Sequence, residues 1–359
     1  MNQDFWRRKR VLVTGHTGFK GSWLSLWLSQ LGAEVTGYSL APEASPSNFE
    51  VCRVGERIES IEGNVCDLEA LKRSVAGFQP EIVFHLAAQS LVRKSYSDPV
   101  ETFQTNVLGT VNVLEAVRQT PSAKAVIVVT SDKCYENREW VWGYREADPL
   151  GGHDPYSSSK GCAEIVAAAY RASYFSGRDG SHRGAGIATA RAGNVIGGGD
   201  WSRDRLVPDA LHAHANSREL VIRNPGAVRP WQFVLEPLCG YMALAESMCA
   251  DGGGFSEAWN FGPGENDVLS VETIVQSLSD HLKGGLRYRI VQDRTLHEAN
   301  LLKLDCSKVR ARLGWRPRTT IHDALKLTAD WHTHMLSGSD MQAVSIAQIS
   351  SFQQLTTGR

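Results

Sequence analysis

The chain has 359 residues, enough for one large domain or two closely associated domains with substantial cores. Its formal net charge of −1 gives no general electrostatic reason to expect binding to nucleic acid or to an anionic membrane. No apolar run is long enough to span a membrane, and seven cysteines without a closely spaced pair favour reduced thiols in the cytoplasm. The composition therefore predicts a compact cytoplasmic protein with no nucleic-acid or membrane partner.

The N-terminal segment has the pattern of a strand, a glycine turn and a helix. Apolar residues 10–14 precede the spacing Gly-x2-Gly-x2-Gly, and an apolar periodic stretch follows from Trp23. Glycines there let the backbone approach a dinucleotide pyrophosphate at a helix N-terminus. A flexible loop is the alternative interpretation. We expect cofactor contacts along the whole loop, with positive charge from two of its members: Gly15, His16, Thr17, Gly18, Phe19, Lys20 and Gly21.

The second expected strand, residues 34–39, ends in Ser39 and carries no acidic residue there. An Asp or Glu at this place would accept hydrogen bonds from the adenosine ribose of NAD. No Arg follows directly to hold the 2′-phosphate of NADP. The residues alone therefore predict a dinucleotide that is bound less tightly than usual.

Tyr156 and Lys160 lie four positions apart, after Asp154 and Pro155, which together are typical of a helix start. On a helix this spacing puts both side chains on one face, where the ammonium group would pull the pKa of the phenol towards neutrality. A phenolate is a usable base for an alcohol. The alternative is an ordinary helix start in which Tyr156 packs.

Together, the glycine loop and Tyr-x3-Lys resemble the extended short-chain dehydrogenase/reductase superfamily. The resemblance implies a doubly wound parallel sheet, and it implies further cofactor contacts in the expected order along the chain. Two of these residues have an alternative structural role: Asp67 could cap a helix, and Asn106 could be a buried amide with all its hydrogen bonds made within the core. The contacts implied are Asp67, Leu68, Leu86, Ala87, Ala88, Gln89 and Asn106, besides Tyr156 and Lys160.

Ser131, Asp132 and Lys133 follow an apolar strand at the edge where such a sheet binds its ligands. Ser131 matches the superfamily residue that hydrogen-bonds the reacting hydroxyl. Sugar-nucleotide epimerases usually have small uncharged residues after it, whereas an acid followed by an amine resembles the CDP-glucose 4,6-dehydratase family. That resemblance extends over nearly the whole chain, through strings such as residues 191–201, 229–232 and 259–263. Phe233 departs from it, because a His is often expected there. A solvated loop pair is the alternative for Asp132 and Lys133.

The resemblance implies NAD as cofactor, CDP-glucose as substrate and no metal. Tyr156, with Ser131 and Lys160, would take the C4 hydroxyl proton while a hydride passes to NAD. Asp132 is the candidate acid and Lys133 the candidate base for elimination of water across C5 and C6, and the hydride then returns to C6. Both residues would have to be neutral at that moment, and a direct ion pair between them would oppose this. Contacts to the substrate are expected from Ser131, Asn194, Arg205 and Arg229.

We expect a cofactor domain over residues 1–185, to which strands near 186–192 and 257–262 return. A smaller interleaved α/β lobe over 193–340 would hold the nucleotide sugar, followed by a tail at 341–359. Helical segments near 99–118 and 156–170 would pair two copies in a homodimer or a dimer of dimers, although the sheet could equally satisfy their apolar faces. Rival functions are a dehydratase or epimerase for another nucleotide sugar and a dinucleotide sensor without turnover.

Overall fold

A parallel β-sheet forms the centre of the molecule. The computed structural model describes residues 2–176, 184–251, 253–264, 267–291 and 301–355. Within these residues the sheet has seven strands in the order β3-β2-β1-β4-β5-β6-β10. Every neighbouring pair is parallel. The strands are β1 Arg10–Thr14, β2 Glu34–Ser39, β3 Glu59–Glu62, β4 Ile82–His85, β5 Ala125–Val129, β6 Gly186–Ala192 and β10 Ala258–Phe261. The expected doubly wound fold is confirmed.

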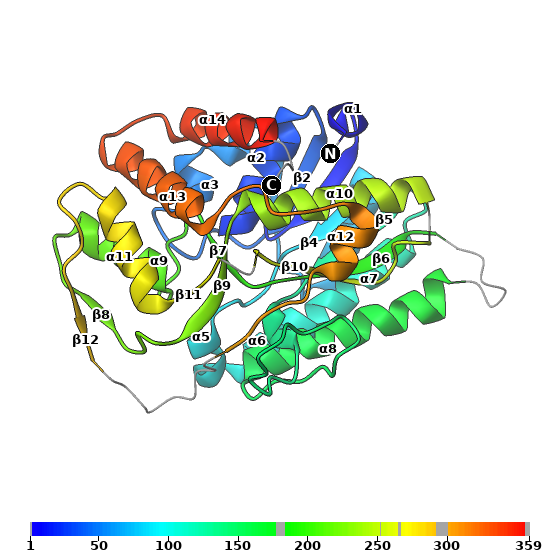
Figure 1. Cartoon of the computed structure of the whole chain (residues 1–359). Coiled ribbons are helices and arrows are strands. Elements are labelled where there is room, and N and C mark those ends of the chain that lie inside the picture. Colours follow the sequence, from blue (N-terminus) through cyan, green and yellow to red (C-terminus); the bar gives the residue numbers. More distant parts are fainter. Residues whose placement is uncertain (1, 177–183, 252, 265–266, 292–300, 356–359) are drawn as a thin grey trace.

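Helices cover both faces of this sheet (Figure 1). Successive side chains of a strand point to opposite faces, so Val11 and Val13 of β1 join one core while Leu12 joins the other. The first core lies under α2 and α10, and the second under α4, α7 and α8. These helices are α2 Phe19–Gln30, α4 Leu68–Phe78, α7 Gly109–Arg118, α8 Pro155–Tyr170 and α10 Leu235–Asp251.

A smaller lobe is built from the second half of the chain. Its strands are β7 Asn194–Ile196, β8 Leu220–Ile222, β9 Val228–Phe233, β11 Val268–Ser270 and β12 Tyr288–Ile290, and its helices are α9 Leu206–Ala215, α11 Val271–His281 and α13 Ile321–Leu336. Helix α12, Ser307–Leu313, packs against β10 of the main sheet and against α10. Because β6 and β10 lie in the main sheet, the chain passes between the two regions more than once. Helix α14, Met341–Gln354, packs against α2. The domain boundaries themselves stay a prediction.

Short helical turns line the edge of the sheet where the parallel strands end. They include α5 Val92–Ser97, α6 Pro99–Phe103, the π-helical turn η2 Gln104–Leu108 and the 3-10 turn η3 Asp132–Cys134. Elsewhere lie α1 Gln3–Trp6, α3 Asn48–Val51, η1 Val54–Glu56 and η4 Arg171–Phe175. Among the described residues, no helix combines the length and apolar character needed to cross a membrane. Functional side chains are expected at the carboxyl edge of the sheet, where loops can converge on a ligand.

Candidate active site

The glycine loop between β1 and α2 is built for close backbone approach. Gly15 has a φ of +76°, and a Cβ at this position would lie 2.6 Å from the backbone nitrogen of Ala87. A Cβ on Gly21 would lie 2.1 Å from the carbonyl oxygen of Gly15, so neither glycine has room for a side chain. Gly18 caps α2 and provides no side-chain acceptor. The first amides of α2 can therefore receive an anionic group, and this cradle fits a dinucleotide pyrophosphate.

The two basic side chains of this loop are less charged than the sequence predicted. Burial lowers the pKa of His16 to about 4, so its imidazole is neutral at neutral pH and the expectation of positive charge there is wrong. Its Nε2 lies 2.7 Å from Ser60 Oγ, and its ring occupies the space that a side chain on Gly37 would need. Burial, followed by repulsion from Lys160 and Arg205, lowers the pKa of Lys20 to about 7. Lys20 is thus only partly protonated at neutral pH.

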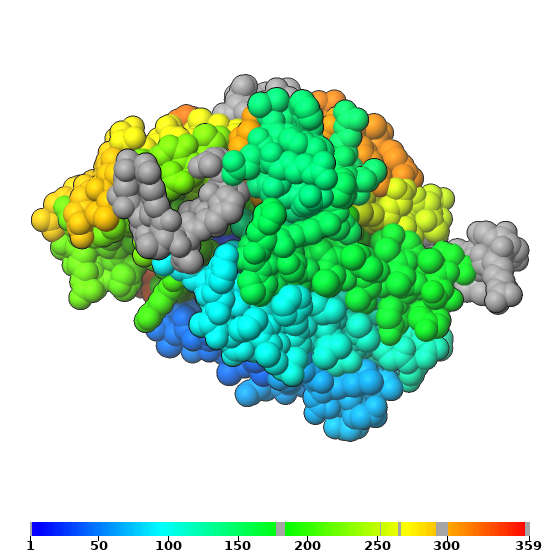
Figure 2. All heavy atoms as spheres, turned by 90° about the horizontal axis from the view of Figure 1, so that it is seen from below, coloured from blue at the N-terminus to red at the C-terminus, as the bar shows by residue number. Residues whose placement is uncertain are grey.

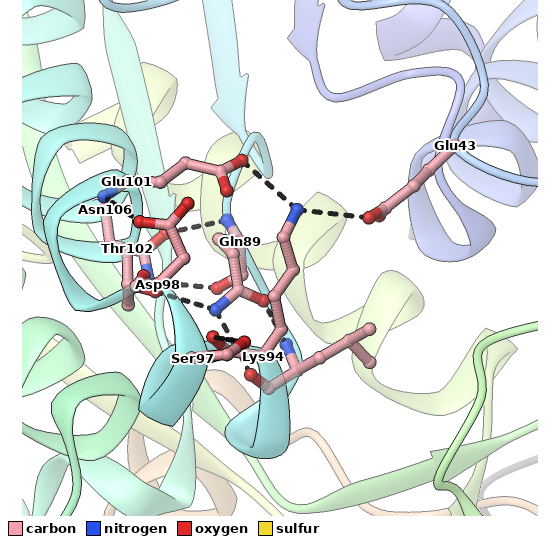
Figure 3. Close-up of polar contacts among 9 residues, drawn as sticks. Glu43, Gln89, Lys94, Ser97, Asp98, Glu101, Thr102 and Asn106 are labelled. Atoms are coloured by element: carbon pink, nitrogen blue, oxygen red, sulfur yellow. Dashed lines mark hydrogen bonds and ion pairs between the residues drawn. The ribbon is translucent and has the colours of Figure 1, made fainter.

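Asn106 holds the loop after β4 in place from the π-helical turn η2. Its Oδ1 accepts a hydrogen bond from the Gln89 amide at 2.8 Å, and its Nδ2 donates to Gln89 O at 2.9 Å and to Ser159 Oγ at 2.8 Å. Figure 3 shows Asn106 and Gln89 facing each other, with Thr102 accepting from Gln89 Nε2. Asn106 is therefore a satisfied buried amide that ties the cofactor loop to the helix carrying Tyr156 and Lys160.

The remaining predicted cofactor contacts lie along the same edge of the sheet. Asp67 is exposed and caps α4, its Oδ1 accepting from Ala70 N at 3.0 Å, while Leu68 begins that helix. Leu86, Ala87 and Ala88 are half-buried beside the glycine loop. A helix cap was the alternative role for Asp67 in the sequence, and the structure shows this cap. The cap uses one carboxylate oxygen, so the other oxygen can still bind a ligand.

Tyr156 and Lys160 are both buried on α8, which Asp154 caps as the sequence indicated. Burial raises the pKa of Tyr156 to about 12, although a hydrogen bond with Ser131 opposes the rise. Burial lowers the pKa of Lys160 to about 8, and Lys160 Nζ donates to the Val129 carbonyl at 3.3 Å. The expectation that Lys160 draws the pKa of the phenol towards neutrality is therefore wrong here, because desolvation dominates.

Ser131 caps the turn η3, which begins with Asp132 and Lys133 shortly after β5. Ser131 Oγ donates to Asp132 Oδ1 at 2.9 Å and accepts from the Lys133 amide at 3.2 Å. The Asp132 side chain is 2% exposed, and its Oδ2 is buried without a hydrogen-bond partner among the described residues. Lys133 Nζ lies 3.7 Å from Asp132 Oδ1, so the acid and the amine form a direct ion pair, the arrangement that opposes their neutral forms. An orphaned buried oxygen is costly and indicates a ligand at this point.

Gly193 supplies the space beside this acid. A Cβ on Gly193 would lie 3.1 Å from Asp132 Oδ2 and 3.0 Å from the side chain of Pro230. Asn194 begins β7 next to this glycine, and Arg229 lies on the neighbouring strand β9, one residue before Pro230. The two strands therefore bring the backbone at Asn194 and at Arg229 close to the turn that carries Asp132.

Arg205 reaches the same edge from the loop before α9. Its guanidinium donates to Asp200 Oδ2 and to Ser90 Oγ, both at 3.1 Å, and its positive charge opposes the rise that burial causes in the pKa of Tyr156. Sequence reasoning named Arg205 but neither Ser90 nor Asp200. Asp200 lies in the string of residues 191–201, which resembles the family, but sequence reasoning assigned this acid no role. Its place in that string was the signal that could have identified it.

A buried ion pair behind the turn was also missed. Glu164 and Arg191 are each 3% exposed and meet at 2.9 Å, and Glu164 also accepts from Thr130 Oγ1 at 2.5 Å and from Thr189 Oγ1 at 2.6 Å. Thr130 directly precedes Ser131, and Glu164 follows Lys160 by one helical turn. The pair therefore holds in place the backbone segments that carry Ser131 and Lys160. The signals in the sequence were a Glu four residues after Lys160 and the place of Arg191 at the start of the string of residues 191–201.

The sequence model of one protein family, GDP-mannose 4,6 dehydratase, matches residues 12–328. This chain belongs to that family. It is 51% identical over 357 residues to a protein of Salmonella typhimurium named CDP-glucose 4,6-dehydratase, covering 99% of both chains.

More distant relatives match nearly the whole chain, and one solved structure among them shares the fold. A dTDP-glucose 4,6-dehydratase of Haemophilus influenzae is 26% identical, covering 92% of this chain and 99% of the relative. The dTDP-glucose 4,6-dehydratase of Streptomyces venezuelae, solved as a double mutant with NAD bound, is 25% identical with a TM-score of 0.77, covering 93% of this chain and 99% of the other. The family therefore extends over nearly the whole chain.

Proposed function

We propose that this protein is an NAD-dependent dehydratase that converts CDP-glucose to CDP-4-keto-6-deoxyglucose and water. The observation that carries the proposal is Asp132, a buried acid with an unpartnered oxygen, between the hydroxyl of Ser131 and the amine of Lys133. Oxidation and re-reduction at one carbon would not need this acid and amine, whereas elimination of water needs both a proton donor and a base. The similarity to the Salmonella protein supports CDP-glucose as the substrate.

Oxidation at C4 is the first step, and it is assigned to Tyr156 with Ser131 and Lys160. Tyr156 takes the proton of the C4 hydroxyl. The Ser131 hydroxyl, which donates to Asp132 Oδ1 in this structure, turns its proton to the phenolate, and the charge of Arg205 adds to the stabilisation. NAD, when bound, would supply a hydride acceptor for C4 and later a hydride donor for C6. Residues 15–21 would hold its pyrophosphate. Burial keeps the phenol and the amine of Lys160 away from bulk water.

Elimination follows, because the C4 ketone acidifies the proton at C5. Lys133 takes that proton, and Asp132 protonates the departing C6 hydroxyl. The two groups lie 3.7 Å apart, so transfer of one proton from Lys133 to Asp132 gives both residues the protonation state that they need. Since Asp132 is almost fully buried, exclusion of water by a bound sugar would favour this neutral pair over the ion pair.

The test is incubation of the purified protein with CDP-glucose and a catalytic amount of NAD in deuterated water, followed by NMR of the sugar. We expect CDP-4-keto-6-deoxyglucose with solvent deuterium at C5. Conversion of dTDP-glucose or GDP-mannose instead would retain the chemistry and overturn the CDP assignment. A C4 epimer without deuterium at C5 would make the protein an epimerase. Binding of NAD without turnover of any nucleotide sugar would favour a sensor.

The protein is further proposed to form a homodimer through α6, η2 and α8. This face carries an apolar hollow of about 410 Å³, lined by Pro99, Val100, Phe103, Gln104, Val107, Leu108 and Cys162. Val100 is 64% exposed, Leu108 54% and Ile165 59%, which is unusual for large apolar side chains on one face. Figure 2 views the side of the molecule on which these helices lie. Leu108→Glu should convert a dimer to a monomer in sedimentation experiments, and an unchanged mass would contradict this interface.

The cytoplasm is the proposed location. All seven cysteines lie among the described residues as thiols, without a disulfide between any two of them. Reduced thiols are typical of reducing compartments.

A further inference from the structure

Two loops leave the carboxyl edge of the sheet on either side of the glycine loop. The strand order places β1 between β2 and β4, so residues 40–47, after β2, lie on one side and α5, after β4, on the other. A dinucleotide whose pyrophosphate lies on the glycine loop must therefore pass between them. Any contact from one loop to the other closes this groove.

Such a contact exists between Glu43 and Lys94. Lys94 Nζ lies 3.2 Å from Glu43 Oε1, and it also lies 3.2 Å from Glu101 Oε1 on α6. Figure 3 shows the Lys94 side chain extended between these two carboxylates, with Glu43 reaching it from a separate loop. The two carboxylates outweigh the effect of burial, which lowers the pKa of Lys94, so that the net pKa is raised and the amine stays charged.

The two sides of this contact differ in how they are held. On the α5 side, Glu101 is fixed by a hydrogen bond from its amide to Asp98 Oδ1 at 3.0 Å, and Arg93 pairs with Asp204 at 3.6 Å. On the other side, residues 41–46 are largely exposed, and within the described chain their single hydrogen bond or ion pair is the one from Glu43 to Lys94. The loop after β2 is therefore the side that can move away.

We propose that Glu43 and Lys94 form a clasp across the dinucleotide groove that slows the exchange of NAD. The proposal rests on the proposed NAD-dependent function. Turnover regenerates NAD, so a retained cofactor serves many cycles, and β2 ends in Ser39, which lacks the carboxylate that would hold the adenosine ribose. A contact that closes the groove compensates for that missing attachment. Lys94 acts here as a positioning residue, with Glu101 as its anchor.

The expected effect is modest, since the Glu43 side chain is 75% exposed and Lys94 33%. Exposed ion pairs of this kind correspond to about a two- to fivefold change in an equilibrium or rate constant. Because salt screens exposed charges, the effect should disappear at high ionic strength.

The experiment measures the release of NAD from the loaded full-length protein by stopped-flow fluorescence, at low and high salt. Glu43→Gln and Lys94→Gln should each speed release about two- to fivefold at low salt, and the double variant should behave like either single variant. Lys72→Gln is the matched control, because Lys72 pairs with Glu69 at 3.4 Å on α4 and does not cross the groove.

Two results would overturn the clasp. One is tight NAD binding with release rates that neither variant changes. The other is an equal acceleration in Lys72→Gln, which would indicate a general effect of surface charge. If the wild-type protein bound no NAD in calorimetry, the proposed function would fail, and the clasp with it. That outcome differs from the first result above, in which NAD binds tightly and the variants leave its release rate unchanged.

Discussion

The buried pair of Glu164 and Arg191 allows a sharp test of what holds the site together. Arg191→Met keeps a long side chain but removes the cation, leaving the carboxylate of Glu164, 3% exposed, without its counter-ion. Removing one partner of such a pair costs about 3–5 kcal/mol of unfolding free energy. We expect that loss in urea denaturation of the NAD-free protein at neutral pH.

Two further variants isolate the cause. Arg145→Met is the control, because Arg145 pairs with Asp305 at 3.2 Å while its side chain is 75% exposed, and it should cost less than about 1 kcal/mol. The double variant Glu164→Gln with Arg191→Met removes both charges and should recover about 1–2 kcal/mol relative to Arg191→Met. A loss below about 1 kcal/mol in Arg191→Met, or a double variant that loses the sum of both single losses, would refute the reasoning.

The pair also has a predictable pH dependence. Burial by itself raises the pKa of Glu164, but the charge and hydrogen bonds of Arg191 outweigh it and the net pKa is lowered from 4.5. A lowered folded-state pKa contributes stability above the unfolded value and loses it as the pH falls further. In Arg191→Met only burial and the threonine hydrogen bonds remain, so the folded-state pKa of Glu164 rises relative to the wild type. The stability gap between the wild type and Arg191→Met should therefore be complete only above that raised pKa of the variant, and it should shrink as the pH falls towards the lowered pKa of the wild type.

Three other predictions concern separate residues. Tyr156→Phe should bind NAD normally but lower the rate of C4 oxidation about 10²- to 10⁴-fold in single-turnover measurements of NADH absorbance, and near-normal oxidation would exclude Tyr156 as the base. Asp132→Asn should still form NADH but accumulate the 4-ketoglucose species without deuterium-labelled product; normal product formation would assign the acid elsewhere. Burial raises the pKa of Glu236 from 4.5 to about 7, so this residue destabilises the fold as the pH rises through that window. Glu236→Gln should thus gain up to about 3 kcal/mol over the wild type between pH 4.5 and pH 8 in urea denaturation, and a constant difference would contradict it.

Local patterns in the sequence predicted much of the architecture. The strand at residues 34–39 has the predicted bounds, and the turn from β1 through Gly15 to α2 lies where the glycine spacing put it. The start of α8 at Asp154 and Pro155 was also predicted from the sequence. These features depend on neighbouring residues, through backbone conformation, capping and the alternation of side chains, which are properties of a short segment.

The electrostatics of the site could not be predicted from such local patterns. Tyr156 and Lys160 were placed on one helix face, but their pKa values follow from burial and from residues distant in sequence, such as Arg205 for Tyr156 and Cys134 for Lys160. The neutral His16 depends on Ser60 and Gly37, which are far from it in the chain. Desolvation is a property of the packed protein, and no local pattern reports it.

By itself the sequence therefore determined the doubly wound sheet, the glycine cradle and the identity of the residues around Ser131 and Tyr156. Only the tertiary structure decided which of their polar atoms are paired. It joined Arg205 to Ser90, Glu43 to Lys94 and Glu164 to Arg191, and it left one oxygen of Asp132 without a partner. The reason is physical: strand and helix patterns repeat every two to four residues, whereas hydrogen bonds and ion pairs at the edge of a parallel sheet join loops whose separation in sequence is set by the crossovers between strands.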